Sequence, residues 1–377
     1  MNRSYERLFQ SFGLGPLVLN NRIIMTPMYT GYAYEDGTVS DLITDHYREM
    51  AASGVGLVIT EHTCIDQKSG GTKRMLRADE NGFIPELSRL AATIKEGGAL
   101  AGCQINHLGR YAQTELPLAP SDFASPLCQH THAMTEEDIQ QVITQYATAA
   151  LRVKKAGFDL VELHGGRGYL LMQFLSPFYN RRTDKYGGSL ENRMRFPLAV
   201  VRAVKETIGD FPVGYRLTGD EWIPGGFSPE EASIVAAELE KAGIIYISVM
   251  TDSNEAPIIN PDYKKLTAED CYAADVSKQI KSAVSIPVVV AGRITTPAMA
   301  EDLLKQGKAD LIGMARGLFC DPLWPQKARR AAENEIIICN NCNACTFRLM
   351  KNEPMTCTLW EKEKRDSRYV KKSSAHE

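Results

Sequence analysis

Short apolar runs alternate with longer amphipathic stretches along most of this 377-residue chain. Eight of the short runs are rich in β-branched residues and predict strands. Most of them are nearly all apolar, as strands buried on both faces of a sheet are. The predicted strands are Arg22–Met25, Val55–Thr60, Leu100–Asn106, Asp159–His164, Val213–Leu217, Ile245–Val249, Val288–Ala291 and Asp310–Met314.

Helical periodicity occupies most of the intervals between these strands. A glycine follows five of the predicted helices directly, which is a common way for a helix to end. The predicted helices are Asp41–Ser53, Ile84–Glu96, Glu136–Ala156, Leu190–Ile208, Pro229–Ala242, Ala268–Ala283 and Pro297–Lys305.

This alternation predicts an α/β protein whose parallel strands close into a (β/α)8 TIM barrel. A doubly wound sheet with a dinucleotide site is the alternative, because right-handed β-α-β units serve both folds. That alternative would place a G-x-G-x-x-G motif after the first strand, and the chain has none there. We therefore favour a barrel over residues 1–335, followed by a cysteine-rich segment at 336–360 and a charged, frayed tail at 361–377.

Composition narrows the class of protein further. Apolar residues make up 44% and charged residues 24% of the chain, and the net charge of −3 argues against a broad nucleic-acid surface. The N-terminal MNRSYERLFQSF lacks the apolar run of a signal peptide, and no stretch approaches the apolar length of a membrane span. These features predict a cytoplasmic protein without membrane or nucleic-acid partners. Its nine cysteines are expected to act as thiols or metal ligands rather than disulfides.

Polar residues gather where the predicted strands end, and a barrel builds its active site from those ends and the loops that follow. Gly-Arg and Ala-Arg pairs follow the last two strands, where barrels usually bind phosphate. The guanidinium group of arginine can donate two parallel hydrogen bonds to a phosphate. A surface ion pair is the alternative for each arginine. The strand-end residues include Thr26, Pro27, Met28, Gln104, Arg216, Gly292, Arg293, Ala315 and Arg316.

His164, Arg167 and Tyr169 lie within six residues of one another after the fourth predicted strand. A histidine can donate a hydrogen bond to a carbonyl oxygen, and a tyrosine can donate a proton. Each residue also has a purely structural interpretation. His164 could be a buried histidine with its hydrogen bonds satisfied, Arg167 could form a salt bridge at the rim, and Tyr169 could pack in the core with its hydroxyl hydrogen-bonded.

Four cysteines near the end of the chain have the spacing C-x2-C-x2-C-x11-C. All-thiolate sets of this kind hold iron–sulfur clusters. A structural zinc site is the alternative, although such sites usually pair two C-x2-C units, whereas here three cysteines stand together and one apart. The predicted metal ligands are Cys339, Cys342, Cys345 and Cys357.

The chain resembles the Old Yellow Enzyme family of FMN-dependent ene reductases. The motifs that carry the resemblance span nearly the whole barrel, and the third is long and specific. The cysteine spacing is similar to that of the branch containing 2,4-dienoyl-CoA reductase and trimethylamine dehydrogenase, which implies one 4Fe-4S cluster after the barrel. The motifs are NRIIMTPM (21–28), QINHLGRY (104–111), VELHGGRGYLLMQFLSPFYNRRTDKYGGSLENRMRF (161–196), YRLTGDEW (215–222), VVVAGRI (288–294) and IGMARGLFCDP (312–322).

The resemblance implies a role for each matched residue. Tyr169 is expected to protonate the substrate α-carbon, and His164 to bind the substrate carbonyl. Arg216 is expected to face the N1/O2 edge of a noncovalent FMN. The remaining FMN contacts would come from Thr26, Pro27, Met28 and Gln104 at the ring, and from Gly292, Arg293, Ala315 and Arg316 at the phosphate.

Three departures from the family pattern change the expectation. The second residue of the carbonyl-binding pair, usually Asn or His, is Arg167, which suggests a more anionic substrate. The loop after the sixth strand contains no histidine, and Tyr29 stands where trimethylamine dehydrogenase has its flavin-linking cysteine, so no such link is expected. The dinucleotide-binding half of those relatives is expected to be absent.

These features together predict a stand-alone FMN- and 4Fe-4S-dependent oxidoreductase that reduces the activated C=C bond of an enoate, an enone or an enoyl thioester. An amine dehydrogenase or demethylase, with electrons leaving through the cluster, is one alternative. An electron-transfer subunit without chemistry of its own is another. The expected partners are a small unsaturated substrate, NADH or NADPH, and a separate ferredoxin or flavoprotein; a homo-oligomer is compatible with the sequence.

Overall fold

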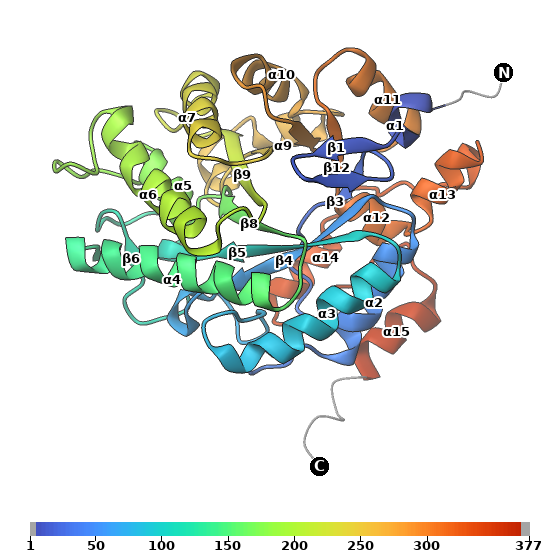
Figure 1. Ribbon diagram of the computed structural model, residues 1–377, viewed down its shortest axis with the longest axis horizontal. Coiled ribbons are helices and arrows are strands. Elements are labelled where there is room, and N and C mark those ends of the chain that lie inside the picture. Colours follow the sequence, from blue (N-terminus) through green and yellow to red (C-terminus); the bar gives the residue numbers. More distant parts are fainter. Residues whose placement is uncertain (1–4, 371–377) are drawn as a thin grey trace.

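Eight parallel strands close into a barrel in the computed structural model, which describes residues 5–370 (Figure 1). Each strand pairs with its neighbours in chain order, and β12 pairs with β3 to close the sheet. The predicted TIM barrel is therefore confirmed. The barrel strands are β3 (Ile23–Met25), β4 (Leu57–Cys64), β5 (Leu100–Asn106), β8 (Leu160–Gly165), β9 (Val213–Asp220), β10 (Ile247–Thr251), β11 (Val288–Ala291) and β12 (Leu311–Met314).

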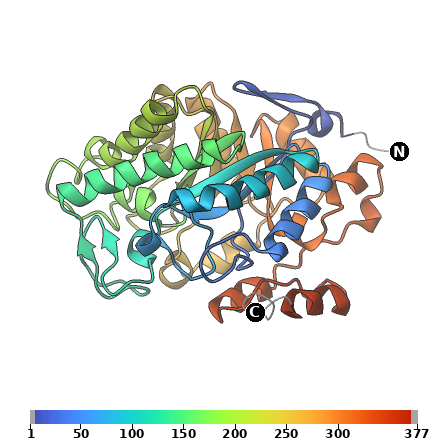
Figure 2. The ribbon, with the colours of Figure 1, turned by 60° about the horizontal axis from the view of Figure 1, so that its bottom comes forward.

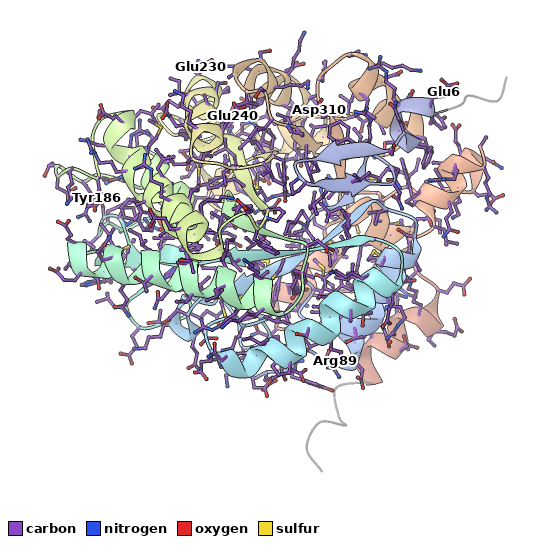
Figure 3. All side chains as sticks on the ribbon, in the orientation of Figure 1. Glu6, Arg89, Tyr186, Glu230, Glu240 and Asp310 are labelled. Atoms are coloured by element: carbon purple, nitrogen blue, oxygen red, sulfur yellow. The ribbon has the colours of Figure 1, made fainter. Side chains whose placement is uncertain are left out.

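The helices between the strands surround the barrel, and their charged side chains, such as Arg89 and Glu230, face outward (Figure 3). All seven predicted helices are present. One begins six residues later than predicted, because Cys271 takes a left-handed conformation with φ +56° that interrupts the helix. The helices are α2 (Asp41–Ala52), α3 (Ile84–Glu96), α4 (Glu136–Lys155), α6 (Leu190–Ile208), α7 (Pro229–Lys241), α10 (Ala274–Ala283) and α11 (Pro297–Lys305).

An antiparallel hairpin, β1 (Phe12–Leu14) and β2 (Leu17–Leu19), covers the amino end of the barrel. Its buried Leu14 and Leu19 pack with residues near the amino ends of the strands, including Leu57 and Leu160. In Figure 2 the hairpin and the C-terminal helices lie on opposite sides of the molecule. The carboxyl end therefore remains available for a site.

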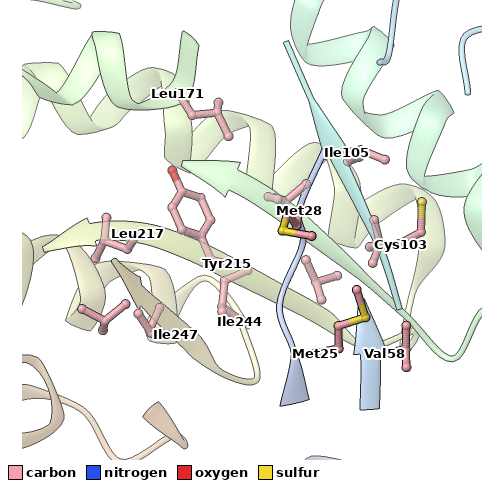
Figure 4. Close-up of a cluster of buried hydrophobic side chains, with 14 of the residues drawn as sticks. Met25, Met28, Val58, Cys103, Ile105, Leu171, Tyr215, Leu217, Ile244 and Ile247 are labelled. Atoms are coloured by element: carbon pink, nitrogen blue, oxygen red, sulfur yellow. The ribbon is translucent and has the colours of Figure 1, made fainter. Parts of the chain in front are cut away.

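The main apolar core fills the space between strands and helices (Figure 4). Met25, Val58, Cys103 and Tyr215 are buried there, and Met28 extends this core toward the carboxyl end of the strands. Packing of this density holds the strand ends in fixed relative positions, which a site composed of several strands requires.

Several short elements lie within the connections and were not predicted, because pieces of two to six residues are too short to show a period. They include α1 (Glu6–Phe9), β6 (Leu118–Ala119), β7 (His132–Ala133), α5 (Leu170–Leu175), α8 (Ala256–Ile259), α9 (Tyr263–Ala268), α12 (Arg316–Cys320) and α13 (Trp324–Arg329).

The end of the chain differs from the prediction. It forms α14 (Ala344–Met350) and α15 (Lys362–Val370), whereas a frayed tail was expected from residue 361. Helix α15 is held because Lys364 and Arg368 both pair with Glu49 of α2. Residues 371–377 of the predicted tail lie outside the described residues. Within residues 5–370, none of the helices combines the length and the apolar character needed to cross a membrane.

Candidate active site at the carboxyl end of the barrel

A bulge in β4 directs two consecutive residues away from the regular strand pattern. The register of β4 against β5 shifts between Thr60 and Thr63, with Glu61 and His62 between them. Bulges of this kind re-aim side chains beside active sites. Glu61 is buried and accepts hydrogen bonds from the backbone N and the hydroxyl of Thr30 on one carboxyl oxygen, while the other oxygen has no partner. Burial raises the pKa of Glu61 to about 8.

This raised pKa predicts a pH-dependent stability. Above its unfolded pKa of 4.5, Glu61 loses its proton in the unfolded chain but keeps it in the folded one up to about pH 8. The folded state then binds more protons, so stability should fall by about 1 kcal/mol per pH unit between those limits. Glu61→Gln resembles the protonated form and should flatten this slope. Urea unfolding at pH 5, 6.5 and 8 measures it; equal slopes for both proteins would contradict the assignment.

A buried polar cluster crosses the barrel below the mouth. The side-chain amide of Gln104 donates to Glu162 Oε1 at 2.8 Å, and the Tyr246 hydroxyl donates to Glu162 Oε2 at 2.8 Å. Burial raises the pKa of Glu162, whereas the nearby Arg216 opposes that rise. The cluster fixes the amide of Gln104, which was predicted to contact a flavin ring.

Arg216 is partly buried and has no carboxylate within ion-pair distance among residues 5–370. Its nearest polar partners are neutral: Ser248 Oγ at 3.3 Å and Met250 Sδ at 3.3 Å. Burial lowers the pKa of Arg216, and an anion in contact with its guanidinium would raise that pKa again. An incompletely paired guanidinium within β9 fits the anionic edge of a reduced FMN ring.

The end of β3 is fixed by its neighbour β12. The Thr26 backbone N donates to the Met314 carbonyl at 2.9 Å, and a side chain at Gly313 would clash with Thr26 Cγ2 at 2.7 Å. Thr26 is buried, Pro27 is partly exposed and Met28 lies in the core. The structure therefore brings all three predicted ring contacts to the carboxyl end, with Pro27 the most accessible of them.

The predicted phosphate-binding residues follow β11 and β12 and are all partly exposed. Arg293 pairs with Asp270 at 2.8 Å, as its surface ion-pair alternative allowed. Arg316 donates to Asn341 and, at 2.9 Å, to Asn343, both within the cysteine-rich segment. Gly292 has φ +143° and lies against Tyr272, where a side chain would clash at 2.7 Å. Close backbone approach, which phosphate binding needs, is thus preserved at Gly292.

Three rings form a triangle at the mouth. His164 and Tyr169 have centroids 5.0 Å apart, His62 and Tyr169 are 5.6 Å apart, and His62 and His164 are 6.1 Å apart. Burial raises the pKa of Tyr169 and lowers that of His164, so a protonated phenol stands beside a neutral imidazole. His62 was not predicted as a site residue, although its place at the end of a strand was a usable signal.

Arg167 is turned toward β10 and away from this triangle. Its Nη1 contacts both carboxyl oxygens of Asp252 at 2.8 and 2.7 Å, and the Tyr263 hydroxyl donates to the same carboxylate. Asp252 raises the pKa of Arg167, which keeps it charged. The Arg167 side chain is 39% exposed, so it forms part of the rim of the mouth. Asp252 was not identified from the sequence, because nothing there shows its pairing with a residue 85 positions away.

The four predicted metal-ligating cysteines lie in one segment beside the mouth but do not assemble. Within residues 5–370, no three His, Cys, Asp or Glu side chains are grouped closely enough to hold a metal ion. Cys357 instead forms a side-chain hydrogen bond with Cys320, and Cys342 is exposed. The donor set suits an iron–sulfur cluster chemically, but its ligand geometry is not formed.

The chain is similar to flavin-dependent oxidoreductases. A family model described as the NADH:flavin oxidoreductase / NADH oxidase family matches residues 7–335. An NADH oxidase from Thermoanaerobacter brockii is 38% identical over 367 residues, a match that covers 94% of this chain and 56% of that protein. An NADPH dehydrogenase from Halalkalibacterium halodurans is 35% identical over 326 residues, covering 86% of this chain and 94% of that protein.

Two solved structures give the same picture. A complex of 2-naphthoyl-CoA reductase with 2-naphthoyl-CoA has a TM-score of 0.90 at 28% identity, covering 95% of this chain and 57% of that chain. Histamine dehydrogenase from Rhizobium sp. 4-9 has a TM-score of 0.83 at 32% identity, and the match covers 94% of this chain and 52% of that chain. This chain thus spans about half the length of several proteins that it matches.

Proposed function

The chain belongs to the NADH:flavin oxidoreductase / NADH oxidase family, and from that membership we propose an FMN-dependent oxidoreductase that reduces an activated C=C bond. This family assignment confirms the resemblance seen in the sequence motifs. The observation that carries the proposed reaction is the pairing of the protonated Tyr169 with the neutral His164, whose ring centroids lie 5.0 Å apart. FMN, once reduced by NADH, NADPH or a carrier protein, would supply the hydride that adds to the β-carbon of the alkene and would itself be reoxidised.

The residues of this chain supply orientation and the proton. The carbonyl beside the alkene accepts a hydrogen bond from His164, which withdraws electron density from the double bond. Tyr169 donates a proton to the α-carbon, and its raised pKa keeps that proton available at neutral pH. Thr26, Pro27 and Gln104 would contact the flavin ring, and Arg216 its N1/O2 edge.

The charge at the rim of the mouth indicates which substrates the site should prefer. Arg167 presents a partly exposed cation, although Asp252 offsets its charge. This favours an enoate or an enone carrying a carboxylate over a neutral enone. An enoyl thioester is the third substrate class that we propose, and the similarity to a reductase that acts on the CoA thioester 2-naphthoyl-CoA supports it.

An anaerobic assay tests the proposed reaction. We expect the reduced protein to be reoxidised by an enoate, an enone or an enoyl thioester without any partner protein, and not by saturated analogues. Reoxidation only by a protein carrier would favour an electron-transfer subunit instead. Reduction of the oxidised protein by amines would favour the amine dehydrogenase alternative, which the similarity to histamine dehydrogenase supports.

Cofactor content is a separate prediction. We expect the anaerobically purified protein to be yellow-brown, with one noncovalent FMN and about four iron atoms per chain. Acid precipitation should release all of the flavin, because Tyr29 offers no thiol for a covalent link. Flavin extraction and metal analysis check both parts. Zinc without iron would contradict the cluster, and FAD in place of FMN would contradict the phosphate-site assignment.

We also propose that the cysteine-rich segment holds a 4Fe-4S cluster and receives a separate ferredoxin or flavoprotein. The match to the NADH oxidase leaves only 6% of this chain uncovered, so wherever that remainder lies the match includes Cys339, Cys342 and Cys345. The same segment exposes large apolar side chains, with Phe347 at 59% and Met350 at 75%. Exposed apolar groups beside a redox centre suit a protein docking surface. We place the enzyme in the cytoplasm, where thiolate ligands remain reduced.

A further inference from the structure

His62 is the third ring of the mouth, and neither the sequence motifs nor the family resemblance assigns it a role. It lies in the bulge of β4, whereas His164 lies in β8 and Tyr169 follows that strand, so two different strands bring these rings together. Both histidines are nine-tenths or more buried, with exposed fractions of 9% for His62 and 6% for His164.

Hydrogen bonds fix the tautomers of both rings. The Asn106 side-chain N–H donates to His62 Nδ1 at 3.3 Å, and the Gly166 backbone N–H donates to His164 Nδ1 at 3.3 Å. Because each Nδ1 accepts, each neutral ring must carry its proton on Nε2. Burial lowers the pKa of His62 to about 4, so the ring stays neutral at physiological pH.

Neither Nε2 has a hydrogen-bond partner within the part of the chain that the structure describes. Neither Nε2 is among the fully enclosed side-chain atoms that lack a partner in residues 5–370, so both N–H groups reach accessible space at the mouth, where a bound ligand can accept from them. The two rings are 6.1 Å apart and both lie beside the Tyr169 ring, a separation that lets a single acceptor reach both.

The second position of the expected carbonyl-binding pair is not free to fill this role. Arg167 donates from its Nη1 to both carboxylate oxygens of Asp252, and its backbone takes a left-handed conformation with φ +61°. Its strongest interaction is thus directed at β10. The ring that does lie beside His164 is that of His62, with centroids 6.1 Å apart.

We infer that His62 is the second hydrogen-bond donor to the substrate carbonyl oxygen, acting with His164, and that Asn106 is the positioning residue that holds His62 in its Nε2–H tautomer. This inference rests on the proposed alkene reduction and deepens it. The ligand is a carbonyl compound whose oxygen lies between two neutral N–H donors. Arg167 stays paired with Asp252 at the rim, where its exposed part faces a charged group farther along the same molecule.

The test compares His62→Phe and His62→Gln. Phenylalanine keeps a ring without a donor, and should slow alkene reduction by about 10²–10³-fold, the usual effect of losing one such donor. Glutamine places an N–H near the original Nε2 and should restore most of the rate. His132→Phe is the matched control, because His132 is a more exposed histidine that pairs with Asp138. An unchanged rate in His62→Phe would overturn the inference.

Two readouts do not depend on turnover. Cyclohex-2-enone has the carbonyl but no anionic group for Arg167, so it isolates the contact with His62 and His164. Calorimetric titration of the oxidised protein with this probe should show weaker binding in His62→Phe and recovery in His62→Gln. Nitrogen-15 NMR should show His62 in the Nε2–H tautomer, and Asn106→Leu should abolish that preference. A proton on Nδ1, or a flavin potential that shifts while enone affinity stays constant, would overturn the inference. If the wild type reduced no alkene but bound cyclohex-2-enone in a His62-dependent way, the proposed function would fail and the carbonyl contact would stand.

Discussion

Tyr169→Phe is expected to leave reduction of the flavin intact and to slow alkene reduction by about 10²–10⁴-fold, the usual contribution of a positioned general acid. The variant keeps the ring that packs against His164 and His62, so the shape of the mouth is preserved. Only the proton donor is removed. Stopped-flow measurement of each half-reaction separates the two effects.

Tyr111→Phe is the matched control for this experiment. Its ring centroid lies 6.4 Å from that of Tyr169, but its hydroxyl contacts Tyr179 at 2.9 Å and Glu255 at 3.2 Å. Loss of that hydroxyl should lower stability with little effect on the rate of the oxidative half-reaction. Equal rates for Tyr169→Phe and wild type would remove Tyr169 from the mechanism.

The pH dependence provides a second check on Tyr169. Burial raises its pKa, while Arg167 and a hydrogen bond with the Asn254 side chain oppose that rise. Because the acid form donates the proton, the rate should be constant through neutral pH and fall only above the usual tyrosine range. A decline that begins near pH 7 would point to a different proton donor.

The sequence predicted the barrel well because its strands are buried on both faces and therefore carry a strong local signal. It predicted Thr26, Gln104, His164, Tyr169 and Arg216 at one end of the barrel because the ends of parallel strands must meet there. The structure places Thr26 just after β3 and Tyr169 after β8. It places Gln104, His164 and Arg216 within their strands, and the roles of all five remain predictions.

The remaining features depend on contacts that no local pattern records. The pairing of Arg167 with Asp252 joins two loops, and the orientation of His62 depends on a bulge in β4. Helix α15 was interpreted as a frayed tail because its composition is highly charged, but Glu49 supplies a partner for two of those charges. The same two side chains also lie over the rings of Trp360 and Tyr32, so α15 depends on tertiary contacts that its own sequence does not record.

The cysteine-rich segment has contacts that do not require a metal. Trp360 is buried and its Nε1 donates to the carbonyls of Phe319 and Cys320 at 3.0 and 3.2 Å. The Met355 backbone N donates to the Thr30 carbonyl at 3.0 Å, just beyond the end of β3. These contacts should hold the segment against the barrel even when one thiolate ligand is lost.

Cys345→Ala is therefore expected to keep its fold and its FMN while losing iron and all electron exchange with a ferredoxin or flavoprotein. Cys128→Ala, which alters a partly buried cysteine outside the segment, should change none of these four properties. Thermal unfolding, flavin content, iron content and anaerobic electron transfer measure them.

The opposing account is that the cluster only fastens the segment to the barrel, since metal binding can supply folding energy outright. Trp360→Ala separates the two accounts, because it removes a buried packing contact and leaves every cysteine in place. It should destabilise the protein by about 3–5 kcal/mol, as truncation of a buried aromatic side chain usually does. Electron exchange should persist in the folded fraction. If Cys345→Ala instead lost FMN and stability together, and no carrier protein bound the wild type, the cluster would be a structural fastener. Arg316 would explain such a joint loss of FMN and cluster, because it belongs to the predicted phosphate site and donates hydrogen bonds to Asn341 and Asn343 between the cysteines.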